Sequence, residues 1–225
     1  KSEESLNRKF HPHLQPSTLN TTASTPLLTA FVAVRKQTEH LMAPLAVEDY
    51  IPQPVVDVSP PKWHLGHTTW FFENFILVPN APGYQLFDDD FGFLFNSYYE
   101  TVGNRLLRHH RGNLTRPTVE KVYAYRKHVD AAMEAYLSEA ELSTELSELL
   151  TLGIQHEQQH QELMVTDLKF NFGHNPLAPA YVPAPPFLSA DDPAVRPAEP
   201  LTFTPHPGGL EAIGARARDG FHFDN

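Results

Sequence analysis

The spacing of apolar residues along the chain is helical over much of its length. The first such pattern begins at residues 24–26, where hydroxyl side chains and a proline suit the first turn of a helix. It then recurs at Leu27, Leu28, Phe31, Val34, Thr38, Leu41 and Leu45. A second helix is expected over residues 59–79, after a loop that is marked by prolines.

Further helices are predicted in the middle of the chain. We expect a short helix over residues 94–106 and, after an irregular stretch, a long helix over 119–139 with Thr118 as its cap. Another long helix is expected to begin near Ser143 and to continue to about Phe172. Four long amphipathic helices with one long crossover predict an all-α four-helix bundle.

The sequence divides into four regions of different character. Residues 1–24 form a polar N-terminal arm, and residues 25–175 hold the helical bundle. A proline-rich linker follows over 176–200. Residues 201–225 suggest short strands and turns, so we expect the beginning of an incomplete α+β domain that has too few apolar residues to bury a core.

Composition excludes several classes of function. The 225 residues carry a formal charge of −10, which disfavours nucleic acid as a partner because phosphate contacts need basic side chains. The chain has no cysteine, so disulfides and thiolate ligands are excluded, which is compatible with a cytoplasmic protein. We expect neither a membrane-spanning helix nor a secretory signal.

The stretch His156-Glu157-Gln158-Gln159-His160 matches the pattern H-E-x-x-H of zinc peptidases. Residues four apart on a helix lie on one face, so two imidazoles at this spacing can bind one metal ion. A polar, solvated helix face is the alternative explanation of such a pair. Which third ligand is present therefore decides what the pair does.

The third ligand of a peptidase is missing from the sequence. A thermolysin-like site needs a glutamate further along, but after Glu162 none occurs before Glu199. A metzincin needs glycine and histidine where this chain has Leu163 and Thr166. We therefore do not expect a peptidase.

A third imidazole is available in the predicted second helix, which carries both His64 and His67. Either one could face the pair across the bundle, while the aromatic residues around them are expected to pack in the core. Three neutral imidazoles suit zinc, iron, copper or nickel, and their spacing does not choose between these metals.

Several segments together resemble a known family. SPPKWHLGHTTWFFE, FNSYYE, RHHRGNLTRPT and QHEQQHQELMVTDLKF are similar to the N-terminal, DinB-like domain of the ergothioneine-biosynthesis sulfoxide synthases, over about residues 25–175. The tail PGGLEAIGARARDGFHFDN resembles the opening of the formylglycine-generating-enzyme-like domain, also called sulfatase-modifying-factor-like, which follows in that family. The ovothiol-type synthases share this architecture.

The resemblance implies non-haem iron(II) held by three histidines, which match His67, His156 and His160 here, whereas His64 is not the motif histidine. It also implies the reaction, in which dioxygen, γ-glutamylcysteine or cysteine, and N-α-trimethylhistidine give a carbon–sulfur bond and a sulfoxide. The substrate site of that family is shared with the second domain, which would have to complete it.

Substrate-binding residues are expected among three arginines, Arg105, Arg108 and Arg111, that recur every third position. Guanidinium groups bind carboxylates through two parallel hydrogen bonds, and both thiol substrates carry carboxylates. We favour Arg108 and Arg111, with Arg105 as the alternative and a solvated basic turn as the simpler explanation.

Tyr98 and Tyr99 are candidate catalytic residues, because some branches of the family use a tyrosine of this pair in oxygen chemistry and a phenol can donate a proton. Gln159 is a candidate for binding the substrate imidazole, and Gln158 is expected at the surface. Glu157 is expected either on the helix surface or as a carboxylate that holds a ligand imidazole.

Other functions stay open at this point. A zinc-dependent thiol transferase, a DinB-like bundle that only binds metal and a non-catalytic fragment are all compatible with the same residues. The thiol donor, the imidazole carbon that is attacked and the oligomeric state are not fixed by the sequence.

Overall fold

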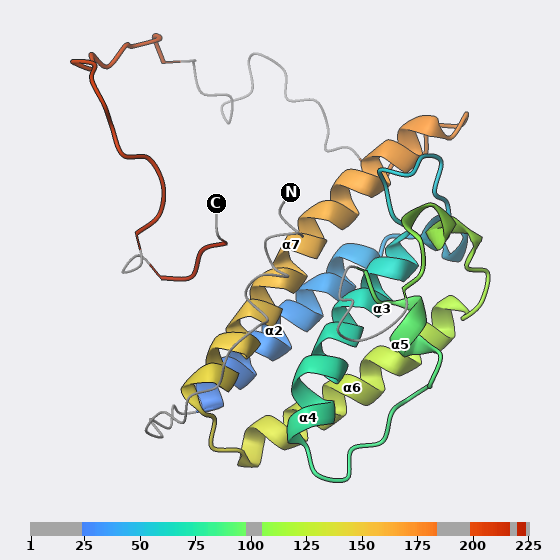
Figure 1. The fold of residues 1–225 in the computed structure, drawn as a ribbon. Helices are drawn as coiled ribbons and strands as arrows, with labels where there is room; N and C mark the ends of the chain where they lie inside the picture. The colour runs from blue at the N-terminus through green and yellow to red at the C-terminus, as the bar shows by residue number, and fades with distance from the viewer. Residues whose placement is uncertain (1–23, 98–104, 184–198, 217–219, 224–225) are drawn as a thin grey trace.

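The protein is a helical bundle in the part of the chain that the structure describes. This computed structural model describes residues 24–97, 105–183, 199–216 and 220–223. The long helices are α2 (Ser24–Met42), α3 (Pro61–Phe72), α6 (Val119–Glu139) and α7 (Thr144–His174). They run side by side, and α2 and α3 each pack against both α6 and α7 (Figure 1). The expected helical domain is confirmed, and no β-strand occurs in the described ranges.

Shorter helical elements connect the long ones. They are the 3₁₀ helices η1 (Val47–Tyr50) and η4 (Arg108–Asn113), the π-helix η2 (Glu73–Leu77), and the short α-helices α4 (Val78–Asn80) and α5 (Phe91–Leu94). The second predicted helix is therefore present as α3, η2 and α4 in direct succession. A π-helical turn widens the helix locally, and apolar spacing alone does not indicate it.

Two predicted helix starts coincide with side-chain caps. The Thr118 hydroxyl accepts a hydrogen bond from the Lys121 backbone N–H at 3.1 Å, at the start of α6. The Ser143 hydroxyl accepts one from the Leu146 N–H at 3.2 Å, at the start of α7. Each cap satisfies one of the backbone donors that a helix leaves free at its first turn.

The predicted helix over 94–106 is wrong in the part that the structure describes. Helix α5 ends at Leu94, and the backbone that follows is irregular. Its carbonyl groups bind side chains of α3 instead of continuing a helix: Leu94 O accepts from Trp63 Nε1 at 3.3 Å, and Phe95 O accepts from His67 Nδ1 at 2.7 Å. Side chains of another helix have thus replaced the local hydrogen bonds.

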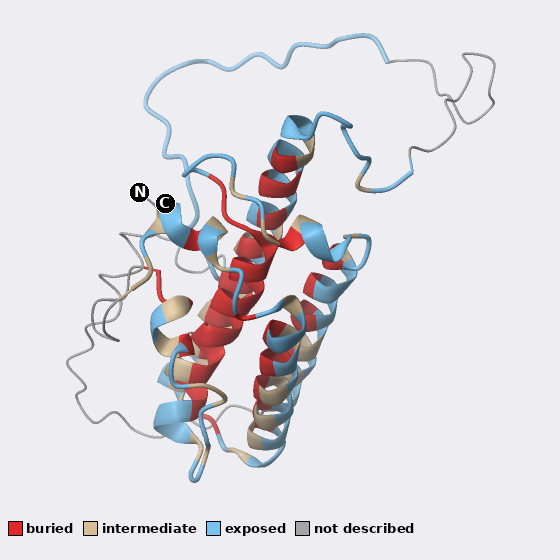
Figure 2. Ribbon diagram, turned by 90° about the vertical axis from the view of Figure 1, so that its right-hand side faces the viewer, coloured by how far each residue is buried: buried red, intermediate tan, exposed pale blue. Residues whose placement is uncertain are grey.

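The core is centred on α3, all of whose residues are buried (Figure 2). Its contact with α7 is close because Gly153 of α7 has no side chain. A Cβ atom at that position would lie 2.8 Å from the rings of both Phe71 and Phe72. This glycine therefore allows the two helices that carry the candidate ligands to pack tightly.

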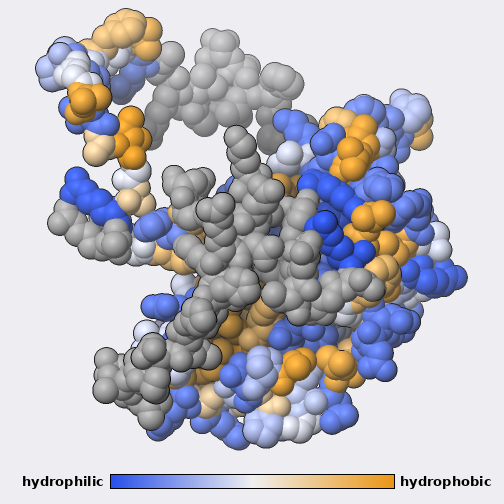
Figure 3. All heavy atoms as spheres, in the orientation of Figure 1, coloured by the Kyte–Doolittle hydropathy of each residue, from blue (hydrophilic) through white to orange (hydrophobic). Residues whose placement is uncertain are grey.

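The chain after α7 has no regular element in its described parts, residues 175–183, 199–216 and 220–223. Several apolar side chains there are exposed, namely Leu177, Leu201, Phe203, Leu210 and Ile213, and Figure 3 shows orange side chains along this tail. The predicted α+β domain over 201–225 stays a prediction. Among the described helices, none has the length and apolar character that crossing a membrane requires.

Candidate metal centre

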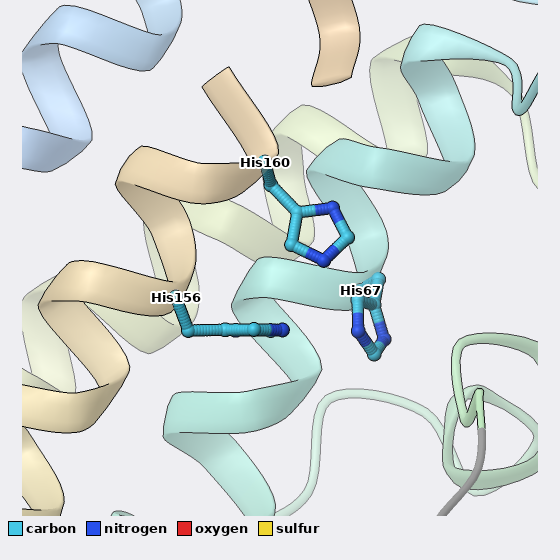
Figure 4. Close-up of side chains that lie close together, drawn as sticks. All are labelled: His67, His156 and His160. Carbon is cyan, nitrogen blue, oxygen red and sulfur yellow. The ribbon is translucent and has the colours of Figure 1, made fainter. Parts of the chain in front are cut away.

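Three histidines from two helices meet inside the bundle. His156 and His160 lie one turn apart on α7, and His67 faces them from α3 (Figure 4). One ring nitrogen from each lies within 4.8 Å of the others. The structure therefore brings together the three histidines that the family resemblance indicated.

The three imidazoles are almost completely buried, with exposed fractions of 1% for His67, 4% for His156 and 2% for His160. Burial is the largest cause that lowers the pKa of each, and it lowers the pKa of His156 to about 4 although the charge of Glu157 opposes the shift. Repulsion from His156 lowers the pKa of His67 and His160 further. All three are therefore neutral near pH 7, the state in which imidazole binds metals.

The orientation of His67 is set by two stacking rings and one hydrogen bond. Trp63 stacks on it with ring centroids 4.6 Å apart and planes 13° apart, and Trp70 stacks at 5.6 Å and 15°. Its Nδ1–H donates to the Phe95 carbonyl, which can only accept, so the lone pair of this neutral ring is on Nε2. Gly66 makes this contact possible, because a Cβ there would lie 2.2 Å from the Phe95 ring.

The donor set fits a transition metal. The Nδ1 atom of His156 is buried and has no hydrogen-bond partner among the described residues, which is costly in a protein interior unless another partner is present. Three nitrogen donors without a carboxylate suit zinc, iron, copper or nickel. His67, His156 and His160 are therefore the residues that would hold the metal and leave its remaining positions for water or substrate.

His64 lies next to this cluster, in contact with His160. Its Nδ1 lies 2.8 Å from Nδ1 of His160, and its Nε2 lies 3.0 Å from a carboxylate oxygen of Asp167. Both ring nitrogens therefore already have partners within the protein. The structure thus disfavours the alternative in which His64 replaces His67 as the ligand from the second helix.

Glu157, the residue that would be the base of a zinc peptidase, is bound by side chains of α2 and α6 and not by the histidines. The prediction that it lies on the helix surface or holds a ligand imidazole is wrong, because it is fully buried and binds Arg35 at 2.9 Å and Arg126 at 3.1 Å. Burial alone raises the pKa of this carboxyl, but the two arginines outweigh it and lower the pKa to about 2. Such a group cannot take a proton from metal-bound water near pH 7, which argues against a peptidase.

The carboxylate of Glu157 is the centre of a buried ionic network that joins the four long helices. Thr38 of α2 donates to Glu157 at 2.7 Å, and Arg35 of α2 also binds Asp130 of α6 at 2.6 Å and Thr69 of α3 at 2.9 Å. Two arginines and two carboxylates give this network no formal net charge. We call this group the ionic clamp, and we use the name for Arg35, Thr38, Thr69, Arg126, Asp130 and Glu157.

The three candidate arginines differ in their surroundings. Arg111 is buried, with its guanidinium 3.3 Å from the centroid of Trp63, and it donates to the hydroxyls of Ser59 at 2.9 Å and Ser97 at 3.0 Å. Because Trp63 stacks on His67, this positive charge lies one aromatic ring away from the metal centre. It also contributes to the lowered pKa of His67 and His160.

Arg108 and Arg105 bind backbone carbonyls instead. Arg108 donates to the carbonyls of Val56 at 3.0 Å and Asp57 at 2.7 Å, and Arg105 donates to the carbonyl of Ser97 at 3.1 Å. Of the two favoured arginines, the structure therefore brings Arg111 close to the histidines, while Arg108 holds a loop.

The remaining candidates are only partly placed. Tyr98 and Tyr99 lie outside the described residues. Gln159 is half-buried on α7 beside His160, and Gln158 is exposed as predicted. Whether Gln159 contacts a substrate imidazole stays a prediction.

Sequence reasoning missed the supporting residues of the site. Asp167 follows His160 by seven positions, so two helical turns place both on one side of α7, and this spacing was a usable signal. The carbonyl of Phe95 left no signal, since a backbone acceptor does not depend on residue type.

The comparison with known protein families agrees with the geometry. The DinB superfamily matches residues 30–164, which is more than half of the chain and includes all three histidines. No curated protein matches the sequence. The helical bundle with its buried histidine cluster therefore belongs to the DinB superfamily.

Proposed function

We propose that this chain is the metal-binding domain of a non-haem iron(II), dioxygen-dependent sulfoxide synthase. The reaction would join γ-glutamylcysteine or cysteine to the imidazole of N-α-trimethylhistidine. The observation that carries the proposal is the buried cluster of three neutral histidines, His67, His156 and His160, at the positions that match the iron ligands of the family the segments resemble. The donor set alone suits several metals, so that resemblance is what favours iron.

Three neutral donors leave the charge of a divalent metal uncompensated by the protein. An anionic ligand such as a thiolate is then favoured at the open positions, because the surroundings are buried and of low dielectric. When bound, the metal would act as a Lewis acid that lowers the pKa of the thiol and holds it near the imidazole and dioxygen.

The protein's own side chains would orient the substrates and keep water out. Trp63 and Trp70 both stack on His67, which restrains the orientation of its imidazole. The guanidinium of Arg111, which lies over the ring of Trp63, would attract the carboxylate of the thiol substrate. Two of its partners, the hydroxyls of Ser59 and Ser97, are neutral and bind a guanidinium less strongly than a carboxylate would.

The proposed partners are the thiol, N-α-trimethylhistidine and dioxygen, in a cytoplasmic enzyme. We further propose that a formylglycine-generating-enzyme-like domain completes the substrate pocket, as in the family that the segments resemble. An ovothiol-type synthase, which shares this architecture, would use the same metal centre with histidine as the acceptor of sulfur.

A zinc-dependent thiol transferase is the second candidate, because three imidazoles with open positions also suit zinc. Metal analysis of protein purified without added metal separates the two. We expect one equivalent of iron, lost in His67→Ala and kept in His40→Ala, whose histidine is exposed on α2.

Activity is then measured with iron(II)-loaded protein, both substrates and dioxygen. We expect dioxygen consumption and a sulfoxide product when the formylglycine-generating-enzyme-like domain is joined downstream, and little turnover by the 225 residues alone. Retained zinc, with no dioxygen consumption in either form, would replace this proposal by the thiol transferase.

A further inference from the structure

A chain of hydrogen bonds leads away from the metal centre behind His160. Asp167 and His160 lie on α7, and His64 of α3 lies between them. The distances are 3.0 Å from an Asp167 carboxylate oxygen to Nε2 of His64, and 2.8 Å from Nδ1 of His64 to Nδ1 of His160. All three side chains are buried, so water does not compete for these contacts.

The proton positions along this chain follow from the acceptor at its end. A carboxylate only accepts, so Nε2 of His64 carries the proton that Asp167 binds. A neutral imidazole carries one ring proton, so with that proton on Nε2 the Nδ1 of His64 has a lone pair and accepts from Nδ1–H of His160. His160 is then protonated on Nδ1, and the lone pair on its Nε2 is the one available to a metal.

Asp167 is itself held in place by the segment that precedes α3. The backbone N–H of Ser59, just before α3 begins, donates to the same carboxylate oxygen at 2.8 Å. The Ser59 hydroxyl in turn accepts from Arg111 at 2.9 Å. The carboxylate that determines the proton positions on His64 and His160 is therefore held by the segment that leads into α3, the helix of His67.

We propose that Asp167 and His64 are positioning residues that fix the tautomer of His160, so that its Nε2 lone pair is presented to the metal. We call the hydrogen-bonded series Asp167, His64 and His160 the tautomer relay. The inference rests on the metal centre of the proposed function, and it concerns which nitrogen binds and how tightly. Partners of this kind behind a metal-binding histidine are typically worth about 10–100-fold in metal affinity.

The test compares variants that remove an acceptor with variants that keep one. His64→Leu and Asp167→Ala break the relay. His64→Gln retains an amide oxygen that can accept from His160, and Asp167→Asn retains an oxygen that can accept from both Ser59 and His64. His40→Ala is the control, since this histidine is exposed on α2.

Two measurements are made on the 225-residue chain. The first is the tautomer of His160 in metal-free protein, from ¹⁵N NMR of its ring nitrogens. The second is the affinity for zinc(II) and for iron(II), by competition with a chelator under anaerobic conditions. We expect the Nδ1–H form in the wild type, and a mixture of tautomers with binding weaker by about 10–100-fold in His64→Leu and Asp167→Ala. His64→Gln and Asp167→Asn should recover most of the affinity.

Wild-type affinity and a pure Nδ1–H form in folded His64→Leu and Asp167→Ala would overturn the relay. Loss of binding in His64→Gln as complete as in His160→Ala would also overturn it, because His64 would then be a ligand. The tautomer is read without metal or substrate. Absence of sulfoxide formation would therefore contradict the proposed function and leave the relay standing.

Discussion

His156 and Glu157 are neighbours in sequence on α7, yet they belong to two buried polar regions with opposite properties. The histidine cluster consists of neutral groups, and Nδ1 of His156 has no partner among the described residues. The ionic clamp around Glu157 consists of charged groups, and both oxygens of this carboxylate are bound by Arg35, Arg126 and Thr38. One helix therefore presents imidazoles with free binding capacity next to a carboxylate whose two oxygens are both bound.

The difference shows how one short motif can serve two purposes. In a zinc peptidase, the glutamate of H-E-x-x-H must be accessible to metal-bound water. Here the glutamate at that position is bound by arginines of α2 and α6, so it joins helices and serves stability. Burying a cluster with unused lone pairs costs free energy. A bound metal ion would offset this cost by accepting those lone pairs.

The largest expected effect is the loss of stability when the ionic clamp is broken. Glu157→Gln leaves two buried arginines with Asp130 as the remaining carboxylate of the clamp, so one buried positive charge loses its counter-charge, which should reduce the free energy of unfolding by about 3–5 kcal/mol. Urea denaturation of metal-free protein measures this. Glu162→Gln is the matched control, because Glu162 is exposed on the same helix. A loss no larger than that of the control would show that the clamp does not stabilise the bundle.

The two regions should lose stability in different pH ranges. The folded pKa of His156 is about 4, below its ordinary value of 6.5, so the unfolded chain binds more protons and stability falls as pH decreases from 6.5 towards 4. The effect is about 3 kcal/mol if the shift is fully expressed. Glu157, with a folded pKa of about 2 against 4.5, contributes stability above pH 4.5 that is lost between 4.5 and 2.

Substitutions of His156 and Glu157 separate the contributions of the two regions to the pH dependence of stability. Denaturation midpoints measured from pH 7 to pH 3 should show a reduced upper slope in His156→Ala, where His67 and His160 still contribute, and a reduced lower slope in Glu157→Gln. If His156→Ala leaves the dependence between pH 6.5 and 4 unchanged, the histidine is not buried in its neutral form.

Metal should raise the free energy of unfolding by binding to the histidine cluster. The ionic clamp should not contribute to this gain, because its groups do not bind the metal. At a free metal concentration of about 100 times the dissociation constant, binding adds about 2.7 kcal/mol to the free energy of unfolding. His67→Ala, His156→Ala and His160→Ala should each abolish this gain in a thermal-shift assay, while His40→Ala keeps it. A full gain in any of the three cluster variants would remove that residue from the ligand set.

The smallest expected effect separates two arginines near the centre. Arg111→Ala should weaken binding of the thiol substrate to metal-loaded protein by about 2 kcal/mol, roughly thirtyfold, because a charge-assisted contact is lost. Arg108→Ala should change it less, since this side chain is bound to the carbonyls of Val56 and Asp57. Calorimetric titration with the thiol compares them. Equal binding by Arg111→Ala and wild type would exclude the carboxylate contact.

The helices were predictable because their signals are local. Thr118 and Ser143 begin α6 and α7 through their own hydroxyl groups, and apolar spacing marks the buried faces. The expected helix over 94–106 failed because the carbonyls of Leu94 and Phe95 are bound by side chains from α3, which no local pattern records.

The candidate site was predictable only in its chemical groups. The spacing of His156 and His160 indicated a metal pair, but the choice of His67 over His64 needed the family resemblance, because both lie on the same buried helix. The surroundings of Glu157 were misjudged, since its two arginine partners come from α2 and α6, which are distant in sequence.

The most direct test of the account is an anaerobic titration of the metal-free chain with iron(II), followed by X-ray absorption at the iron edge. The account predicts one iron per chain with three imidazole ligands, and no specific site in His67→Ala. A site that keeps its iron in His67→Ala, or that contains a protein carboxylate as ligand, would contradict the claim that the three neutral histidines form the metal centre.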